Sequence, residues 1–133
     1  MGQVFNRGAL GLQSGGGISW TGDTIKARLS RTSESLSKDA TSMTGLGVAA
    51  TDVVVTSPTI TEDQANDRIV FDHADPVFAS VTGAEVDKYI LFKFVTNDAG
   101  STPIASVSIA AITPFGGDIT AVVASTGAFY LQQ

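Results

Sequence analysis

Residues 88–109 form a predicted β-hairpin, and this stretch limits the possible folds more than any other part of the chain. The run KYILFKFV at 88–95 is rich in branched and aromatic side chains, which suit a pleated strand, and it is too short for a typical helix. The turn-forming cluster NDAG follows at 97–100, and the return IASVSI at 104–109 alternates in polarity. We expect residues 88–95 to be a central strand with both faces covered.

Other short segments with strand character surround the hairpin and are separated by Gly, Pro, Asn and Asp. Residues 24–30 alternate in polarity, which predicts a half-buried strand. Its buried face would carry Ile25, Ala27 and Leu29, and its exposed face Lys26 and Arg28. The other predicted strands are 52–56, 67–72, 118–123 and 128–131, with 59–66 extended and 77–81 a connecting loop packed on the core. Seven or eight such strands predict an all-β fold, a single-domain antiparallel β-sandwich that is jelly-roll-like.

Two segments lack a strand pattern. Residues 1–17 contain six glycines, and glycine costs about 1 kcal/mol per interior helical position relative to alanine. We therefore expect a Gly-rich N-terminal arm with at most one short helix. Residues 32–47 are polar and low in aromatic side chains, which predicts a long loop. The predicted division is an arm at 1–17 and a β-sandwich domain at 18–133, since 133 residues are enough for one core and too few for two.

Charge, hydrophobic patterning and composition argue against several classes of partner and chemistry. The net charge is −5, and the eight Lys and Arg residues are scattered along the chain. Binding to a phosphate backbone needs several cations on one face, so direct nucleic-acid binding is not expected. No apolar run approaches the roughly 20 residues that span a bilayer, and the N-terminus lacks the pattern of an export signal, so no membrane partner is expected. The absence of cysteine excludes disulfides and thiol chemistry.

His73 is the only histidine and lies in the run FDHAD at 71–75. Catalysis by Ser, His and Asp needs a histidine that accepts the serine proton while a carboxylate fixes its tautomer. The sequence supplies the residue types for such a site but no spacing that points to one. We expect His73 to be a polar residue at a strand end, and we expect no catalytic residue and no enzyme activity. A small hydrolase that uses His73 stays open as an alternative.

The densest carboxylate stretch contains Glu62, Asp63, Asp67, Asp72 and Asp75. It lacks the alternating acids and the glycine bend of the helical calcium loop. First-row metals favour several imidazole, thiolate or carboxylate ligands, and only carboxylates are abundant here. A solvated acidic loop is therefore favoured and no metal site is predicted, although a calcium site assembled from β-loops stays open.

Neither the glycine run nor the single tryptophan indicates a cofactor. The run GGG at 15–17 lacks the Lys-Ser/Thr partner and the following helix of a phosphate loop, so we interpret it as a flexible joint. Trp20 is the sole tryptophan, and such a residue beside a strand is more often a core or interface anchor than a sugar-stacking platform. We expect no cofactor.

Several segments follow one another in a characteristic order along the chain. They are DTIKARL at 23–29, NDRIVFDHAD at 66–75, VTG at 81–83 leading to KYILF at 88–92, NDAGSTPI at 97–104, GGDIT at 116–120 and GAFYL at 127–131. In this order the chain resembles, over most of its length, a group of small β-rich structural proteins from the virions of tailed bacteriophages. Residues 11–17 and 30–42 fall outside the shared pattern.

The resemblance implies a capsid decoration or cement protein, on the exterior of the virion capsid after assembly in the host cytoplasm. Such proteins bind the outer head lattice as dimers or trimers and hold neighbouring major capsid subunits together. The implied partners are therefore the major capsid protein lattice and further copies of this chain. We expect residues 1–12 and 32–47 to carry these contacts and to order on binding. The predicted interface residues are Val4, Phe5, Leu10, Leu12, Trp20, Leu36, Met43 and Leu46.

Two further functions stay open. One is another phage part, such as a head fibre, tail or baseplate component. The other is a carbohydrate-binding or adhesion β-sandwich, in which Trp20, Tyr89 and Tyr130 are the candidate stacking residues.

Overall fold

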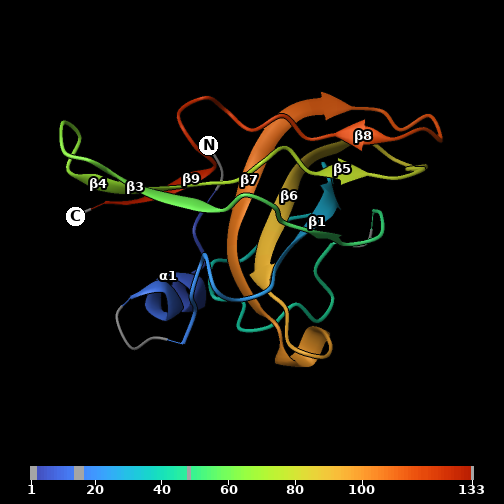
Figure 1. Cartoon of the computed structure of the whole chain (residues 1–133). Coiled ribbons are helices and arrows are strands. Elements are labelled where there is room, and N and C mark those ends of the chain that lie inside the picture. The colour runs from blue at the N-terminus through green and yellow to red at the C-terminus, as the bar shows by residue number, and fades with distance from the viewer. Residues whose placement is uncertain (1–2, 14–16, 48, 133) are drawn as a thin grey trace.

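Antiparallel β-sheets are the main regular structure of the protein in the computed structural model, which describes residues 3–13, 17–47 and 49–132 (Figure 1). The first sheet has the order β2 (Val53–Val54), β1 (Ile25–Arg31), β6 (Val86–Lys93), β7 (Thr102–Ile112). The second has the order β3 (Thr59–Asp63), β4 (Arg68–Asp72), β9 (Phe129–Gln132), and β5 (Val77–Phe78) pairs with β8 (Ile119–Thr120) as a separate ribbon. The fold is all-β and sandwich-like, as the sequence predicts. The jelly-roll arrangement and the domain division stay predictions.

The predicted hairpin is confirmed as β6 and β7, joined through the 3₁₀-helix η1 (Asp98–Gly100). Strand β6 lies between β1 and β7, and its residues 89–92 are completely buried. The side chain of Asn97 accepts a hydrogen bond of 3.0 Å from the backbone N–H of Gly100, which closes the turn. Strong β-formers followed by a capped turn therefore give the central strand that was expected.

Strand β1 lies where the sequence predicts it, but the expectation of a half-buried strand is wrong. Ile25, Ala27 and Leu29 are buried as expected. On the opposite face, Ser30 is also fully buried and Arg28 is only 7% exposed. The physical reason is that residues 32–47 cover this face, which local alternation does not reveal.

The main hydrophobic core lies against one face of the first sheet and includes Leu29, Tyr89 and Leu91. A second hydrophobic cluster lies on the opposite face of this sheet. It contains Phe5, Met43, Ile90 and Phe92, all with 0% exposure. Phe5 comes from the N-terminal segment and Met43 from residues 32–47, so the two segments without strand pattern supply half of this cluster. The first sheet is thus covered on both sides, which explains why β6 has no exposed face.

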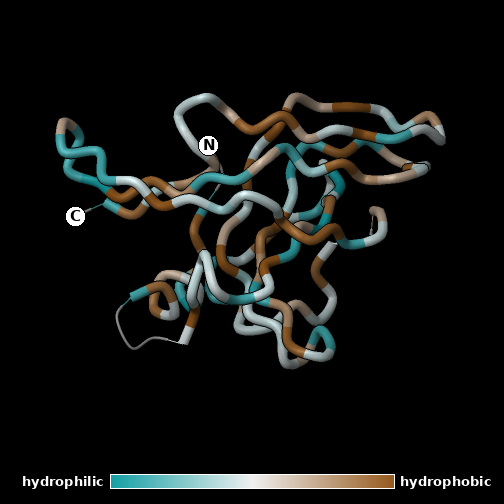
Figure 2. The backbone as a smooth tube through the Cα atoms, in the orientation of Figure 1, coloured by the Kyte–Doolittle hydropathy of each residue, from teal (hydrophilic) through white to brown (hydrophobic). Residues whose placement is uncertain are grey.

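Two of the remaining predicted strands are much shorter than the sequence predicts, whereas those predicted at 67–72 and 128–131 are present as β4 and β9 within one residue. The strand expected at 52–56 is reduced to β2, and the one expected at 118–123 to β8. Residues 77–81 were expected to be a connecting loop, but Val77 and Phe78 form β5 and pair with Thr120 and Ile119. Both shortened strands are limited by pairing, since β2 pairs with β1 and β8 pairs with β5 over two residues only. Figure 2 shows hydrophilic residues at the turn between β3 and β4, at the tip of the second sheet.

The described part of residues 1–17 packs on the first sheet. Val4 forms an isolated β-bridge with Ala105 of β7, and Phe5 donates its backbone N–H to the carbonyl of Ile104 at 2.9 Å. The helix α1 (Asn6–Leu12) follows directly, which agrees with the expectation of at most one short helix in this segment. The flexible joint predicted at 15–17 lies outside the described residues except for Gly17. No helix within the described residues is long and apolar enough to cross a membrane.

Gly8 allows α1 to lie directly on the backbone of β7. A Cβ atom at this position would lie 2.4 Å from Ile104 Cα and 2.7 Å from the Pro103 carbonyl oxygen. In an isolated helix, glycine to alanine is favourable by about 1 kcal/mol. We expect Gly8→Ala instead to lower the free energy of unfolding by about 1–3 kcal/mol, because strand backbone cannot move aside cheaply.

Urea unfolding followed by circular dichroism measures this change. Leu10→Ala is the matched control on the same helix, because Leu10 is 59% exposed, and it should change stability by less than about 0.5 kcal/mol. A Gly8→Ala protein more stable than wild type would show that α1 does not pack this closely.

Candidate interaction surface

His73 is held in a buried hydrogen-bonded pair with Tyr89. The histidine directly follows β4, as expected of a polar residue at a strand end, but only 6% of it is exposed. Its Nδ1 lies 2.7 Å from the carbonyl oxygen of Ala74, which only accepts, so Nδ1 carries the proton. Nε2 then accepts from the Tyr89 hydroxyl at 3.0 Å. Both ring nitrogens are occupied within the chain, an arrangement that stabilises the core.

The neutral form of His73 is favoured in the folded protein. Burial lowers the pKa of its imidazole, and this outweighs the opposing effects of the Ala74 carbonyl and of the charges on Asp72 and Asp75. Burial also raises the pKa of the Tyr89 hydroxyl, which keeps that group neutral. The pair therefore exists as two neutral partners at physiological pH.

Acidification should destabilise the protein through this histidine. Because the folded-state pKa is lowered, the unfolded chain binds more protons below its own histidine pKa of about 6.5. The contribution of His73 to stability should therefore be fully present above that pH, and it should decrease as the pH falls from it toward the folded-state pKa.

Denaturant unfolding at pH 7.5 and 5.5 measures this loss of stability. His73→Gln is the control, since the chain has no other histidine and the variant should lose less stability over this interval. Equal losses in both proteins would contradict the assignment.

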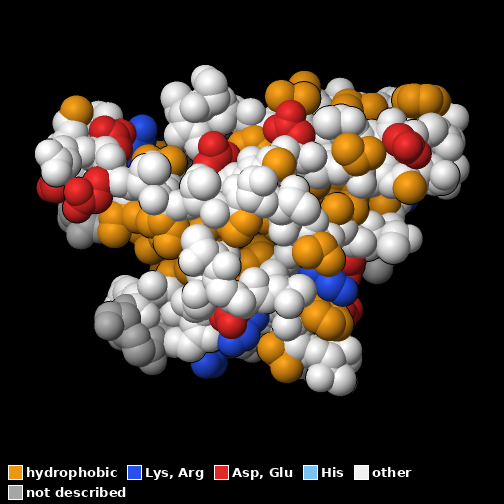
Figure 3. All heavy atoms as spheres, viewed as in Figure 1, with side chains coloured by type: hydrophobic (Ala, Val, Ile, Leu, Met, Phe, Trp, Pro, Cys, Tyr) orange, Lys and Arg blue, Asp and Glu red, His pale blue; other side chains and the backbone are white. Residues whose placement is uncertain are grey.

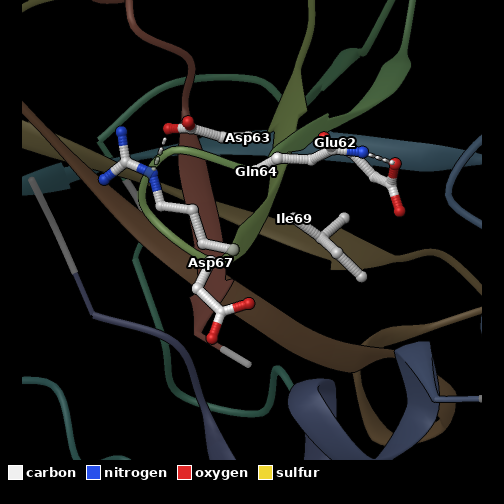
Figure 4. A pocket seen from close by; sticks show the side chains of 6 residues that line it. Glu62, Asp63, Gln64, Asp67 and Ile69 are labelled. Carbon is white, nitrogen blue, oxygen red and sulfur yellow. Dashed lines mark hydrogen bonds and ion pairs between the residues drawn. The ribbon is translucent and has the colours of Figure 1, made fainter.

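The acidic turn between β3 and β4 borders a shallow hollow of about 240 Å³, lined by Glu62, Asp63, Gln64, Asp67, Arg68 and Ile69 (Figure 4). Asp63 accepts hydrogen bonds of 2.8 Å from Arg68 Nε and from Asn66 Nδ2. Both bonds lower the pKa of the Asp63 carboxyl, and the bond from Asn66 has the larger effect. Figure 4 shows the carboxylates of Glu62, Asp63 and Asp67 pointing in different directions. Within the described residues no group of three His, Cys, Asp or Glu side chains could hold a metal ion.

Residues 32–47 are fixed to the first sheet by Arg28. The guanidinium of Arg28 forms a bidentate pair with Asp52, in which Nε and Nη2 each donate at 2.8 Å. It also donates to Asp98 at 2.8 and 3.2 Å, and to the carbonyl of Leu46 at 3.0 Å. The hydrogen bond from Arg28 lowers the pKa of the Asp98 carboxyl. One buried cation thus joins β1, the turn after β6 and the end of the 32–47 segment.

Glu34 and Met43 provide further attachments for this segment. Glu34 accepts a hydrogen bond from the buried hydroxyl of Ser30 and another of 2.8 Å from the backbone N–H of Gly47. The backbone N–H of Met43 donates to the carbonyls of Asp98 and Ser101, each at 3.1 Å. The segment is therefore anchored to its own sheet in the absence of a partner, although its composition suggested that it would order only on binding.

The anchored segment presents a polar outer surface, which we call the anchored surface. Its exposed members are Thr32, Ser33, Ser35, Ser37, Lys38, Asp39, Thr41, Thr44 and Gly45. Asn6 of α1 joins it, because its side chain donates to Asp39 at 2.7 Å and its backbone N–H donates to the Lys38 carbonyl. The sequence identified the segment but not the buried anchors that hold it.

The predicted interface residues occupy three kinds of position. Phe5, Trp20 and Met43 are buried inside the chain, so no partner reaches them in this fold. Four others are half-buried and pack against the two clusters: Val4, Leu12, Leu36 and Leu46. Only Leu10 has a largely exposed side chain. These residues were chosen because they are hydrophobic, and most hydrophobic side chains of this chain pack in its own core.

Two of the candidate stacking residues are also buried. Trp20 is 1% exposed and Tyr89 is 0% exposed, so neither offers a ring face to a sugar. The third, Tyr130, is half-buried, and the Arg68 guanidinium lies over its ring at 4.3 Å from the centroid. The carbohydrate-binding alternative therefore loses the residues on which it depended.

Sequence reasoning missed several exposed apolar side chains. Phe115 is 77% exposed, Val122 68% and Val77 48%. They lie in or next to the β5–β8 ribbon, where the sequence predicted a turn, a strand and a packed loop. Their exposure depends on which face of the ribbon packs on the core, so no local pattern could have identified it.

Comparison with known proteins identifies no relative for this chain. No protein-family model matches it, and neither a curated protein nor a solved structure matches it significantly.

Proposed function

We propose that this chain is a non-enzymatic bacteriophage virion structural protein, a capsid decoration or cement protein that binds the outer head lattice. The proposal rests on the segment order that resembles small phage virion proteins, together with the all-β fold. The partners are the major capsid subunits and further copies of this chain, in a dimer or trimer. The location is the capsid exterior, after assembly in the host cytoplasm.

The anchored surface is the observation that carries the proposal. A loop of this length and composition would normally lose considerable conformational entropy on binding. Here Arg28, Glu34 and Met43 already hold it against the first sheet, so little ordering remains to be done. Its Ser and Thr hydroxyls suit a wet, hydrogen-bonded contact with another protein. Weak contacts of this kind become strong on a lattice, because many copies bind in a regular array.

The test uses heads purified from a phage whose gene for this chain has been deleted. Purified protein should co-sediment with these heads and saturate at a copy number set by the lattice. Parallel sedimentation with purified tails distinguishes a decoration protein from a tail or baseplate component. Wild-type protein that is folded by circular dichroism but does not bind heads would overturn the proposal.

Point variants test the surface, because a deletion of residues 1–12 would also remove the buried Phe5. Ser35→Arg and Thr44→Arg place bulky cations on exposed positions whose hydroxyls make no hydrogen bond within the described residues. We expect the double variant to bind heads at least about tenfold more weakly, as when the centre of an interface is blocked. Thr126→Arg, on an exposed turn elsewhere, is the matched control and should bind like wild type.

A further inference from the structure

The β5–β8 ribbon presents an apolar face to solvent. Val77 and Thr120 form a pair with both side chains exposed, whereas the adjacent pair, Phe78 and Ile119, is 0% and 2% exposed. Since side chains alternate across a strand, one face of the ribbon packs on the core and the other faces outward. Val122 lies diagonally opposite Val77 on the outward face and is 68% exposed.

Phe115 stands at the end of the same ribbon in an anchored turn. Backbone hydrogen bonds extend the ribbon to it: Val81 donates to the Gly117 carbonyl at 3.0 Å, and Gly116 donates to the Val81 carbonyl at 2.8 Å. The ring of Phe115 is 77% exposed. We call Val77, Phe115 and Val122 the ribbon face. Figure 3 shows hydrophobic and acidic side chains together over this end of the molecule. An exposed aromatic ring on fixed backbone loses little entropy when it is buried by a partner.

The charges on the ribbon are all negative. In residues 75–81 and 115–123 the only charged side chains are Asp75 and Asp118. Asp75 Oδ1 accepts from the backbone N–H of Val123 at 2.8 Å, and Asp118 Oδ1 accepts from that of Ser80 at 3.1 Å. No hydrogen bond within the described residues uses the Oδ2 atom of either. A second copy of this chain would bring like charges to the contact, whereas a partner with Lys or Arg would complement them.

We infer that the ribbon face is a second docking surface, and that it binds a major capsid subunit at a site with an apolar centre and a Lys or Arg margin. This inference rests on the proposed function and extends it. The ribbon lies at the upper right of Figure 1, whereas residues 32–47 run through its lower part. One molecule therefore contacts the lattice at two separate places, which is what holding two subunits together requires.

The apolar part of the inference is tested with the double variant Phe115→Ser and Val122→Ser. Both side chains are exposed, so the variant should keep the wild-type circular dichroism spectrum and unfolding midpoint. Its affinity for heads that lack this protein should fall by at least about tenfold, as for loss of an aromatic anchor from an interface. Ile60→Ser is the matched control, because Ile60 is an apolar side chain on β3, 48% exposed and outside both proposed surfaces, and it should bind like wild type.

The charged part is tested with Asp75→Asn and Asp118→Asn together. Asparagine keeps the Oδ1 acceptor for Val123 and Ser80 and removes only the charge. This variant should bind heads more weakly at low salt, and its affinity should depend less on salt concentration than that of wild type.

The outcomes separate this inference from the proposed function. Wild-type protein that does not bind heads overturns both. Wild-type protein that binds, with the serine variant binding equally well, overturns the inference alone. A serine variant that binds normally but changes oligomeric state in sedimentation velocity also overturns it, since the ribbon face would then join copies of this chain.

Discussion

Arg28→Ala is expected to lower the free energy of unfolding by about 3 kcal/mol relative to wild type. This is the lower end of the range for removing one partner of a buried ion pair. The Arg28 side chain is 8% exposed, and its N–H groups face Asp52, Asp98 and the Leu46 carbonyl. Alanine would leave these acceptors without their donor. The Asp52 and Asp98 side chains are 23% and 48% exposed, so water compensates them partly and the upper end of the range is not reached.

Urea unfolding followed by circular dichroism measures this loss, and hydrogen exchange locates it. The amides of residues 32–47 should exchange faster in the variant than in wild type, because the contact between Arg28 and the end of this segment is lost. Residues 89–92 in the centre of β6 should stay protected under the same conditions. Binding to heads should weaken together with the order of the segment.

Two controls distinguish the geometry of the guanidinium from its charge. Arg28→Lys keeps the charge, but a single ammonium cannot serve two carboxylates and a carbonyl in the same planar arrangement, so most of the loss should remain. Arg7→Ala removes an exposed arginine of α1 and should change stability by less than about 0.5 kcal/mol. An Arg28→Ala protein as stable as the Arg7→Ala protein would show that Arg28 does not hold this region.

The hairpin could be predicted from the sequence, whereas the buried contacts of Arg28 could not. Strands β6 and β7 are predictable because strand propensity, alternation and a capped turn all lie within one short stretch of chain. The partners of Arg28 lie 24 and 70 residues away in the chain, at Asp52 and Asp98. Nothing near either aspartate marks it as a partner, and Asp98 was interpreted as a turn residue. For this reason the sequence pattern predicts an exposed face of β1 at Lys26 and Arg28, whereas Arg28 is buried.

The same reasoning applies to the surfaces proposed for binding. Residues 32–47 were identified because a long polar stretch without strand pattern is visible in the sequence. Their anchoring was not, since it depends on Ser30, Gly47 and the second cluster. The ribbon face was missed altogether, because the outward exposure of Val77 and Val122 follows from a pairing between strands 43 residues apart, as the register Val77 to Thr120 shows. Hydrophobic residues alone led instead to Phe5, Trp20 and Met43, which the core uses.

Trp20→Ala is expected to lower the free energy of unfolding by about 3–5 kcal/mol, the range for truncation of a large buried aromatic side chain. The indole is 1% exposed and packs edge-on against Phe71 and Phe129, with ring centroids 5.8 and 5.4 Å away. Its Nε1 donates to the carbonyls of Thr59 and Asp72 at 3.1 and 3.3 Å. Trp20 precedes β1 and contacts β3, β4 and β9, so its loss should loosen the second sheet from the first.

Trp20→Phe separates the packing of the ring from its hydrogen bonds. This variant keeps an aromatic ring but loses the donor to two carbonyls, so it should cost about 1–3 kcal/mol and less than Trp20→Ala. Unfolding must be followed by circular dichroism, because the chain has no other tryptophan to report by fluorescence. Phe115→Ala is the matched control: an equally aromatic but 77% exposed side chain, whose removal should change stability by less than about 0.5 kcal/mol.

These variants also decide between the two roles that the sequence left open for Trp20. A core anchor should affect unfolding strongly, and its replacement by phenylalanine should leave head binding of the folded protein unchanged at a temperature well below the melting point. An interface anchor should do the reverse. If Trp20→Ala were as stable as Phe115→Ala and bound heads more weakly, the indole would face a partner, and the packing of the second sheet against β1 would have to be different from the one described.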